Sequence, residues 1–539
     1  MLKNWFRHLN IFSVLSIIIG IMILMPMFNI LFELFSPPSD AWEHIKTYLL
    51  KEYLINSAIL IMCTVTMALI IGFVSAYFVA RFEFAGRKLL SWMLVLPLAI
   101  PSYIAGYVYA DMTSYTGTLT RWFGVNLNLM NVYGASMIFA FTLYPYVYLL
   151  SLASLSRQSA SYIESSTMLG ASKWRSLFRI TIPLLRPALV AGGLLVVLET
   201  LNDYGLVAYF NVRVFSFAIF NAWFSLGDLV SAIRLSAYLM LIVFTVVLVE
   251  RFLRGRKRYQ MHVRSKGIMR KKLRPLHQFF VVLILFFILW FGFMMPVLQM
   301  IWYVLLTFAQ TYGIELFYAS FHTVSNAVIA ALIIVFISLI MTNFNRLKNR
   351  SKISKIWVKL SNLGYAIPGA VIAVAVHLFF VDLDRLLHPI YKVFDSNAPT
   401  LVITMSLFTL IFAYVLRFLS IGFNSIESQY EKTGDKFTES AYMLGSSKLE
   451  ALFRIDLPLI YPGLITAFIL VFVDIIKELP LTLILRPANY DSLTTLVYVY
   501  VRNEMIQEAA LPSLLLISIA GLLIYGVTHY KKGMFSHVY

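Results

Sequence analysis

The 539-residue chain contains a single cysteine and few charged residues. Cys63 has no second cysteine to pair with, which excludes an intramolecular disulfide framework. Only 13% of the residues are Asp, Glu, Lys or Arg, whereas 60% are hydrophobic, and the mean hydropathy is +0.80. A soluble or disordered protein cannot have this balance, because it has too little polar surface to cover so many apolar side chains. The composition therefore predicts an all-α polytopic membrane protein.

The sequence also lacks the phosphate-binding motif Gly-x-x-x-x-Gly-Lys-[Ser/Thr], so we expect that the chain cannot hydrolyse ATP by itself. No group of His, Asp and Glu residues has the spacing of metal ligands or of a nucleophile and its base. A membrane enzyme is accordingly the weakest interpretation. We predict no catalytic residue, no cofactor bound by this chain and no permanent metal site.

Apolar runs of about 20 residues, the length that crosses the hydrocarbon core of a membrane, recur along the whole chain. We expect twelve spanning helices, near residues 11–35, 54–80, 89–110, 132–154, 184–206, 232–252, 278–306, 322–343, 360–381, 401–422, 459–485 and 509–530. We interpret the first as a retained helix, since no small-residue cleavage site follows a short apolar core. Twelve crossings place both termini on the same side.

The net charge of +18 is explained by where the basic residues lie. Loops on the side of the termini carry 33 of the 44 Lys and Arg residues, and eleven of these fall between Arg251 and Arg274. By the positive-inside rule this side is the cytoplasm. We attribute the charge to topology and to contact with anionic membrane lipid, and expect no nucleic-acid binding.

One segment occurs twice, once in each half of the chain. Residues 164–187 and 439–462 are identical at 14 of 24 positions without a gap, and each lies between the fourth and fifth expected span of its half. Ala99-Ile-Pro101 and Ala366-Ile-Pro368 are a weaker echo. We therefore divide the chain into a first six-helix unit (1–254), a basic cytoplasmic linker (255–276) and a second six-helix unit (277–539), related by a pseudo-twofold axis.

The sequence of each copy predicts a first helix that ends at a glycine able to adopt positive φ. A second helix, capped by a serine, follows it. Gly170 ends the first helix of the first copy, and Ser172 is the expected cap of the next. The resulting elbow carries apolar side chains such as Trp174 and Phe178 into water. It either folds against its own helix ends or binds a soluble partner, and two copies on one face favour a dimeric partner.

The repeated segment resembles the EAA loop of ABC importer permeases. In both copies glycine stands six residues after the glutamate, isoleucine sixteen and proline nineteen: these are Glu164, Gly170, Ile180 and Pro183, and Glu439, Gly445, Ile455 and Pro458. Where two alanines are usual, the chain has Ser165-Ser166 and Ser440-Ala441. Segments 198–205, 222–228 and 477–487 are similar to those of ferric-iron permeases.

This resemblance implies the fused permease subunit of an ATP-driven importer in the bacterial inner membrane, with the fold of a type I ABC importer. The elbows would be ATPase-coupling loops for a separate cytoplasmic homodimer, which binds ATP and Mg²⁺. An extracytoplasmic binding protein would deliver ferric iron, and transport would proceed by alternating access. The alternatives are an importer of thiamine, phosphonate or another small solute, and an ion-coupled carrier.

Two acidic pairs lie at matching depth in the fifth and eleventh spans. Glu199 and Asp474 each follow a proline by twelve residues, and Asp203 and Glu478 follow four residues later. A charge at the membrane centre costs at least about 2.5 to 3.5 kcal/mol, so these side chains should face the bundle interior or an aqueous cavity. We predict that they line a pathway for a cationic substrate and bind it only transiently. The alternative is structural: pairing with Lys477, or capping of a broken helix.

Four other residues are weaker pathway candidates. His377 stands alone in the ninth span, where a packing role is more usual, and Asp111 ends the third. Pro101 and Pro368 interrupt apolar spans, and the backbone groups that a proline frees must be buried or line a cavity.

Overall fold

The computed structural model describes residues 11–33, 37–124, 126–157, 168, 170–254, 270–347, 357 and 363–536. Within these ranges the chain is almost entirely helical, which confirms the all-α class. The only strands in the described ranges are β1 (Phe82–Glu83) and β2 (Lys271–Lys272), which pair in parallel.

The helices of the first half alternate between long apolar helices and short connecting ones. In chain order they are α2 (Ile11–Glu33), α3 (Asp40–His44), α4 (Leu50–Arg81), α5 (Arg87–Met93), α6 (Ser102–Thr113), α7 (Thr118–Phe123), α8 (Val132–Arg157), α10 (Lys173–Ser176), α11 (Ile182–Asn202), α12 (Gly205–Tyr209), α13 (Phe215–Phe220) and α14 (Leu229–Arg254).

The second half follows the same order. Its helices are α15 (Pro275–Leu289), α16 (Met295–Thr311), α17 (Ile314–Leu347), α19 (Gly369–Phe394), α20 (Leu407–Thr433), α21 (Lys436–Met443), α22 (Lys448–Ala451), α23 (Leu457–Ile476), α24 (Pro480–Leu485), α25 (Leu493–Arg502) and α26 (Ala510–Ser536).

The repeat extends to local backbone irregularities. A π-helical turn precedes the fifth span of each half, at the equivalent positions Leu177–Thr181 and Leu452–Asp456. A 3₁₀ turn precedes the helix after each predicted break, at Leu96–Ala99 and Leu363–Ala366. Because such turns interrupt the regular hydrogen-bond ladder, their recurrence shows that the two halves share backbone geometry as well as sequence.

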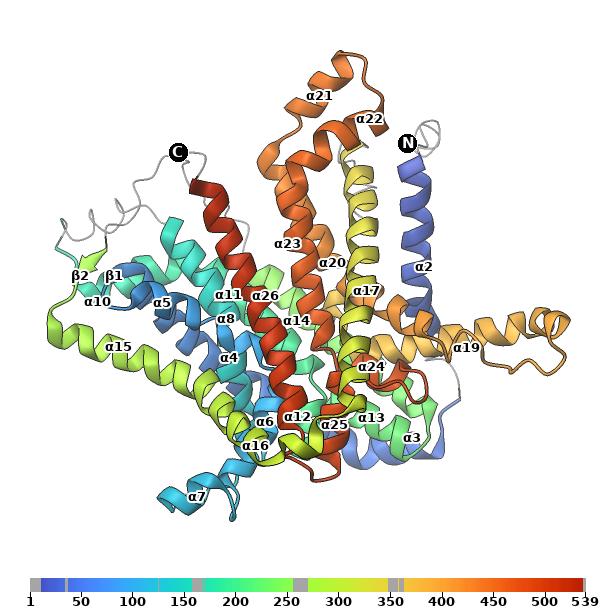
Figure 1. Cartoon of the computed structure of the whole chain (residues 1–539), viewed down its shortest axis with the longest axis horizontal. Helices are drawn as coiled ribbons and strands as arrows, with labels where there is room; N and C mark the ends of the chain where they lie inside the picture. The colour runs from blue at the N-terminus through green and yellow to red at the C-terminus, as the bar shows by residue number, and fades with distance from the viewer. Residues whose placement is uncertain are drawn as a thin grey trace.

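The described residues hold nine helices that are long and apolar enough to cross a membrane, or ten if α5 and α6 count as one broken span. The described helices differ from the twelve expected spans in two places. The third is bent by 91° between Ala99 and Ser102. The ninth begins only at Gly369, after Pro368, and α19 runs sideways out of the bundle in Figure 1. Helix α26 (Ala510–Ser536) covers the expected twelfth span.

The first helix of each half packs against the other half. Helix α2 contacts α14, α17 and α19, while α15 contacts α4 and α5. In Figure 1, α2 accordingly stands beside α17, and α15 runs across to the side of α5. The two halves therefore interlock through α2 and α15.

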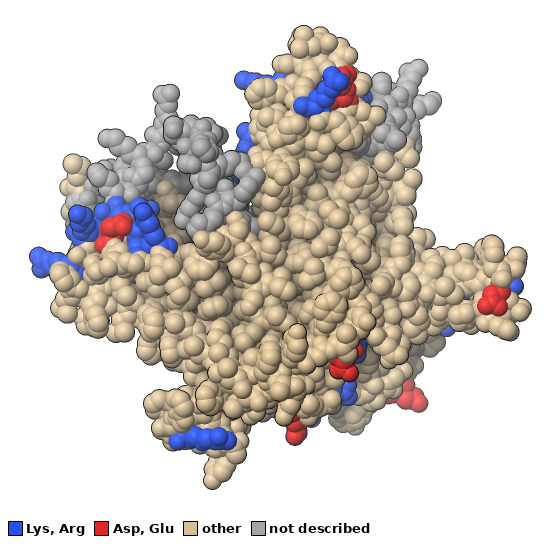
Figure 2. Space-filling model, in the orientation of Figure 1, with Lys and Arg blue, Asp and Glu red and all other residues tan. Residues whose placement is uncertain are grey.

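Charged side chains mark the two ends of the molecule. Figure 2 shows Lys and Arg near α22 and around the β1–β2 strands, and further charges at the opposite end and at the projecting tip of α19. The body of the molecule between the two ends forms a broad belt almost free of charge on this face. This pattern is expected of a membrane-embedded surface, because ionised side chains are costly in hydrocarbon. Helices α21 and α22 project from the end where α2 begins and α26 ends (Figure 1).

Candidate translocation site

The fifth span of each half breaks inside the bundle and continues as a short helix. Helix α11 ends at Asn202, and the amide of Leu206 in α12 donates to Oδ1 of Asp203 at 2.8 Å. In the second half α23 ends at Ile476, and the amide of Leu481 in α24 donates to Oε1 of Glu478 at 3.2 Å. The first amides of a helix have no intrahelical partner, so each carboxylate caps the helix that follows. The capping of a broken helix, which was the structural alternative for these carboxylates, is therefore present in both halves.

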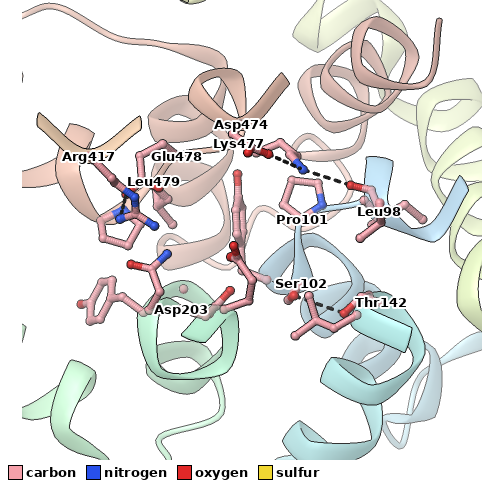
Figure 3. A pocket seen from close by; sticks show the side chains of 18 of the residues that line it. Leu98, Pro101, Ser102, Thr142, Asp203, Arg417, Asp474, Lys477, Glu478 and Leu479 are labelled. Carbon is pink, nitrogen blue, oxygen red and sulfur yellow. Dashed lines mark hydrogen bonds and ion pairs between the residues drawn. The ribbon is translucent and has the colours of Figure 1, made fainter. Parts of the chain in front are cut away.

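Both breaks open onto one pocket, with about 710 Å³ of empty space including its open mouth. All four predicted carboxylates line it: Glu199, Asp203, Asp474 and Glu478. In Figure 3, Asp203 enters from the ribbon of the first half, while Glu478 and Asp474 enter from the second half on the opposite side. The structure thus brings together four residues from two distant segments, while their part in transport stays a prediction.

The second-half carboxylates are paired with cations. Nη1 of Arg417 lies 3.0 Å from Oε1 of Glu478, and each side chain is only 5% exposed. Nζ of Lys477 lies 3.5 Å from Oδ1 of Asp474, as the structural alternative predicted.

The first-half carboxylates differ. No Lys, Arg or His in the described ranges forms an ion pair with Glu199 or Asp203. Glu199 instead accepts a hydrogen bond from the Tyr365 hydroxyl at 2.9 Å. In the described ranges, direct ion pairs in the pocket are therefore formed only by the second-half carboxylates.

Two further side chains connect the halves at the pocket. The backbone amide of Gly369 donates to Oδ1 of Asn202 at 2.6 Å, and Nζ of Lys477 donates to the carbonyl oxygen of Leu98 at 3.1 Å. Asn202 and Lys477 are equivalent in the repeat, because the alignment of segment 164–187 with segment 439–462 continues without a gap to both of them. The broken fifth span of each half is therefore hydrogen-bonded to the third span of the other half.

One pair of positions breaks the pseudo-symmetry. In the first half Ser102 and Thr142 share a hydrogen bond of 3.2 Å between their hydroxyls. Their counterparts are Gly369 and Arg417, since the same alignment extended backwards pairs Thr142 with Arg417, and Pro101-Ser102 aligns with Pro368-Gly369. A Cβ atom added to Gly369 would overlap Nη1 of Arg417 and lie 2.7 Å from Oε1 of Glu478. The guanidinium therefore occupies the space beside Glu478 that a side chain at position 369 would need.

A second pocket adjoins the first on the side of α12, α13 and α25. It encloses about 1850 Å³ including its open mouth, and both halves line it. Tyr103, Tyr204 and Gly205 line both pockets, so they form the neck between them. The hydroxyls of Tyr204 and Tyr498 lie 3.2 Å apart and join the two halves here.

The weaker candidates lie at different distances from this site. Pro101 lines the first pocket, and Pro368 directly precedes α19. His377 packs edge-to-face against Trp223 with ring centroids 4.9 Å apart and lines neither pocket. Asp111 accepts a hydrogen bond from the Tyr303 hydroxyl and also lines neither.

The glycines of the two elbows have the predicted left-handed conformation, with φ of +77° at Gly170 and +90° at Gly445. The amide of Arg175 donates to Oγ of Ser172 at 3.3 Å, which confirms that cap. Trp174 is 71% exposed and Phe178 is 61% exposed, so the elbow presents apolar surface. Glu164 lies outside the described residues.

The second elbow presents the same kind of surface and is anchored at its base. Met443 and Leu444 are 90% and 87% exposed. Below them, Arg346 of α17 forms ion pairs with Asp435 at 2.8 Å and with Asp456 at 3.3 Å. A movement of this elbow would therefore be transmitted to α17.

Sequence reasoning missed Arg417, Asn202 and Tyr365. Arg417 did carry a signal, because it is a lone cation inside the apolar run of the tenth span, and an ionisable residue in such a run marks a functional position by default. The other two carry no distinguishing pattern. Tyr103 is one of 31 tyrosines, and the sequence favours a place in the interfacial aromatic belt for such residues over a ligand role.

Comparison with known proteins agrees with this architecture. Residues 68–259 and 334–530 both match the profile of the binding-protein-dependent transport system inner membrane component. The chain is 27% identical over 494 residues to the Fe(3+)-transport system permease protein FbpB 2 of Haemophilus influenzae, covering 89% of this chain and 90% of that protein.

Shorter matches are to sulfate permeases. The chain is 32% identical over 143 residues to the sulfate transport system permease protein CysT of Escherichia coli, and 32% identical over 146 residues to CysW of the same organism. These matches cover 51% and 50% of those proteins, about half of their length. With two matched segments spanning most of its length, the chain belongs to the family of binding-protein-dependent transport system inner membrane components and is a fused, two-unit permease subunit of such a transporter.

Proposed function

We propose that this permease imports ferric iron. The observation that carries the proposal is the central pocket, where four carboxylates from both halves meet only two cationic side chains. Carboxylates are hard oxygen ligands and lower the barrier for a hard cation. Similarity to an Fe(3+)-transport permease over 90% of that protein supports the same substrate.

The pocket is better suited to passing a metal ion than to holding one. Among the described residues, no three His, Cys, Asp or Glu side chains are grouped closely enough to hold a metal ion. Conduction requires sites from which the ion can leave again. We therefore assign Glu199, Asp203, Asp474 and Glu478 to a pathway that the ion occupies briefly.

We further propose that a separate cytoplasmic ATPase homodimer drives transport, with one subunit on each coupling loop. The exposed apolar residues of the two elbows and their shared backbone geometry support this docking. Closure of the dimer on ATP would move the elbows together and rock the units 1–254 and 277–539 between inward-open and outward-open states. Both termini and the linker 255–276 then lie in the cytoplasm, and an extracytoplasmic binding protein delivers the ion from the opposite side.

A sulfate importer is the second candidate, because local identity to sulfate permeases reaches 32%. The charges of the pocket disfavour it. Arg417 and Lys477 are already paired with Glu478 and Asp474, so an anion would meet the unpaired carboxylates Glu199 and Asp203.

Uptake of radioactive iron into cells that depend on this transporter tests the proposal. We expect Glu199→Gln with Asp474→Asn to lower iron uptake far more than protein abundance, while Asp382→Asn, an exposed carboxylate outside the pocket, leaves it unchanged. Unchanged uptake in the double variant would indicate that both residues have a structural role only. Uptake of sulfate in place of iron would overturn the substrate assignment.

A further inference from the structure

Tyr103 has a buried hydroxyl without a partner. Its side chain is 5% exposed, and the hydroxyl oxygen accepts and donates no hydrogen bond among the described residues. Burying a hydroxyl unsatisfied costs about 1 to 3 kcal/mol, so an orphan of this kind calls for an explanation. Tyr103 lines both pockets and thus lies at the neck between them.

Two carboxylates line the first pocket together with Tyr103, Asp203 from the first half and Glu478 from the second. They are equivalent in the repeat, because Asp203 follows Asn202 by one residue and Glu478 follows Lys477 by one residue. Figure 3 shows them approaching the pocket from opposite sides. The first pocket therefore brings together, beside the neck, three oxygen-bearing side chains from three separate elements.

Each carboxylate uses only one of its oxygens in the described contacts. Oδ1 of Asp203 caps α12, and Oε1 of Glu478 accepts from both Arg417 and the Leu481 amide. The second oxygen of each, Oδ2 and Oε2, accepts no hydrogen bond from the described residues. Structural capping thus leaves one oxygen per carboxylate free for a ligand.

The backbone is shaped to bring these groups close. A Cβ atom added to Gly205 would lie 2.7 Å from Cβ of Tyr103 and 2.9 Å from Cδ2 of Leu479. Any larger residue at position 205 would push the Tyr103 ring away from the break that carries Asp203. Glycine here allows three elements of both halves to meet.

We propose that Asp203, Glu478 and Tyr103 form a transient cation subsite where the neck opens into the first pocket, so that Asp203 and Glu478 are the first carboxylates of that pocket that an ion meets when it arrives from the second pocket. This proposal rests on the proposed cation import and adds its entry point. Arg417 beside Glu478 keeps the site from holding the ion permanently, because its positive charge opposes the cation. The ligand is a hard, multiply charged cation, with ferric iron as the substrate in question.

The test is iron moved per ATP hydrolysed, measured in proteoliposomes with the full complex of permease, ATPase and iron-loaded binding protein. Tyr103→Phe removes only the hydroxyl, and Asp203→Asn removes the charge but keeps an oxygen that can cap α12. We expect each to lower iron moved per ATP about tenfold, the size of one interaction with a charged group, with ATP hydrolysis retained.

Tyr144→Phe is the matched control, because the Tyr144 hydroxyl is also buried and without a partner in the described chain but lines neither pocket. It should move iron like the unmodified protein. Equal loss in Tyr144→Phe and Tyr103→Phe, or no loss in Tyr103→Phe, would overturn the subsite while iron import stands. Failure of the unmodified complex to move iron would instead overturn the proposed function, and the subsite with it.

Discussion

Asn202 and Lys477 occupy equivalent positions in the two halves, and each bonds to the backbone of the opposite half. Asn202 accepts from the amide of Gly369 at 2.6 Å, and Lys477 donates to the carbonyl of Leu98 at 3.1 Å. The carbonyl of Leu98 belongs to the third span of the first half, and the amide of Gly369 belongs to the third span of the second half. Both spans are interrupted, and their free backbone polar groups need partners inside a membrane. The broken fifth span of one half therefore stabilises the broken third span of the other.

Replacing Asn202 should weaken the contact between the halves. In Asn202→Leu the amide of Gly369 loses its acceptor, which costs about 1 to 3 kcal/mol for a buried group. We expect a lower midpoint of thermal unfolding in detergent. Asn397→Leu, an exposed asparagine in the loop after α19, is the control, and an equal shift there would show a nonspecific effect.

Gly369→Ala should displace the Arg417 guanidinium, because the added methyl group overlaps Nη1. Overpacking of this kind typically costs about 1 to 3 kcal/mol. Gly521→Ala in α26 is the matched control, because a Cβ atom added there meets no atom within 4 Å. Thermal unfolding should be lowered in the first variant and unchanged or raised in the second. Equal stability of both would contradict the packing described around Arg417.

Arg417→Met should destabilise the protein more than the double variant Arg417→Met with Glu478→Gln. Removing one partner of a buried ion pair leaves an uncompensated charge, at a cost of about 3 to 5 kcal/mol, whereas removing both leaves none. The yield of folded, monodisperse protein and its unfolding temperature measure this difference. If the double variant is as unstable as the single one, the pairing does not explain the position of Arg417.

Gly170→Pro together with Gly445→Pro should detach the ATPase while the chain stays folded. Proline fixes φ near −65°, which is incompatible with +77° and +90° at these positions. Co-purification of the ATPase in detergent measures the loss. The control is Gly124→Pro with Gly227→Pro. It introduces the same backbone conflict, at φ of +66° and +62°, in the loop after α7 and the loop before α14. Retained co-purification in the first pair would count against docking on these loops.

Much of the architecture could be predicted from the sequence. Apolar runs identified nine of the spanning helices, and the repeat placed Glu199 with Asp474 and Asp203 with Glu478 in one pocket. Those predictions succeed because hydrophobicity and repetition are properties of the sequence itself. The third and ninth spans are not continuous helices, because Pro101 and Pro368, which the sequence marked as interruptions, break apolar segments and start new helices in other directions.

The partners of the carboxylates could not be predicted in the same way. Arg417 reaches Glu478 from 61 residues away, and Tyr365 reaches Glu199 from 166 residues away. Such contacts depend on how helices pack, and on a missing side chain at Gly369 that has meaning only in three dimensions. Lys477 was the exception, since its pairing with Asp474 lies within one helical turn.

The most direct test of the account is transport by purified protein in liposomes, with and without its ATPase. The account predicts that iron moves only when the ATPase, ATP and Mg²⁺ are all present, and that it stops when the two coupling loops carry Gly170→Pro and Gly445→Pro. Movement of iron through the permease alone, without any ATP-hydrolysing partner, would contradict it.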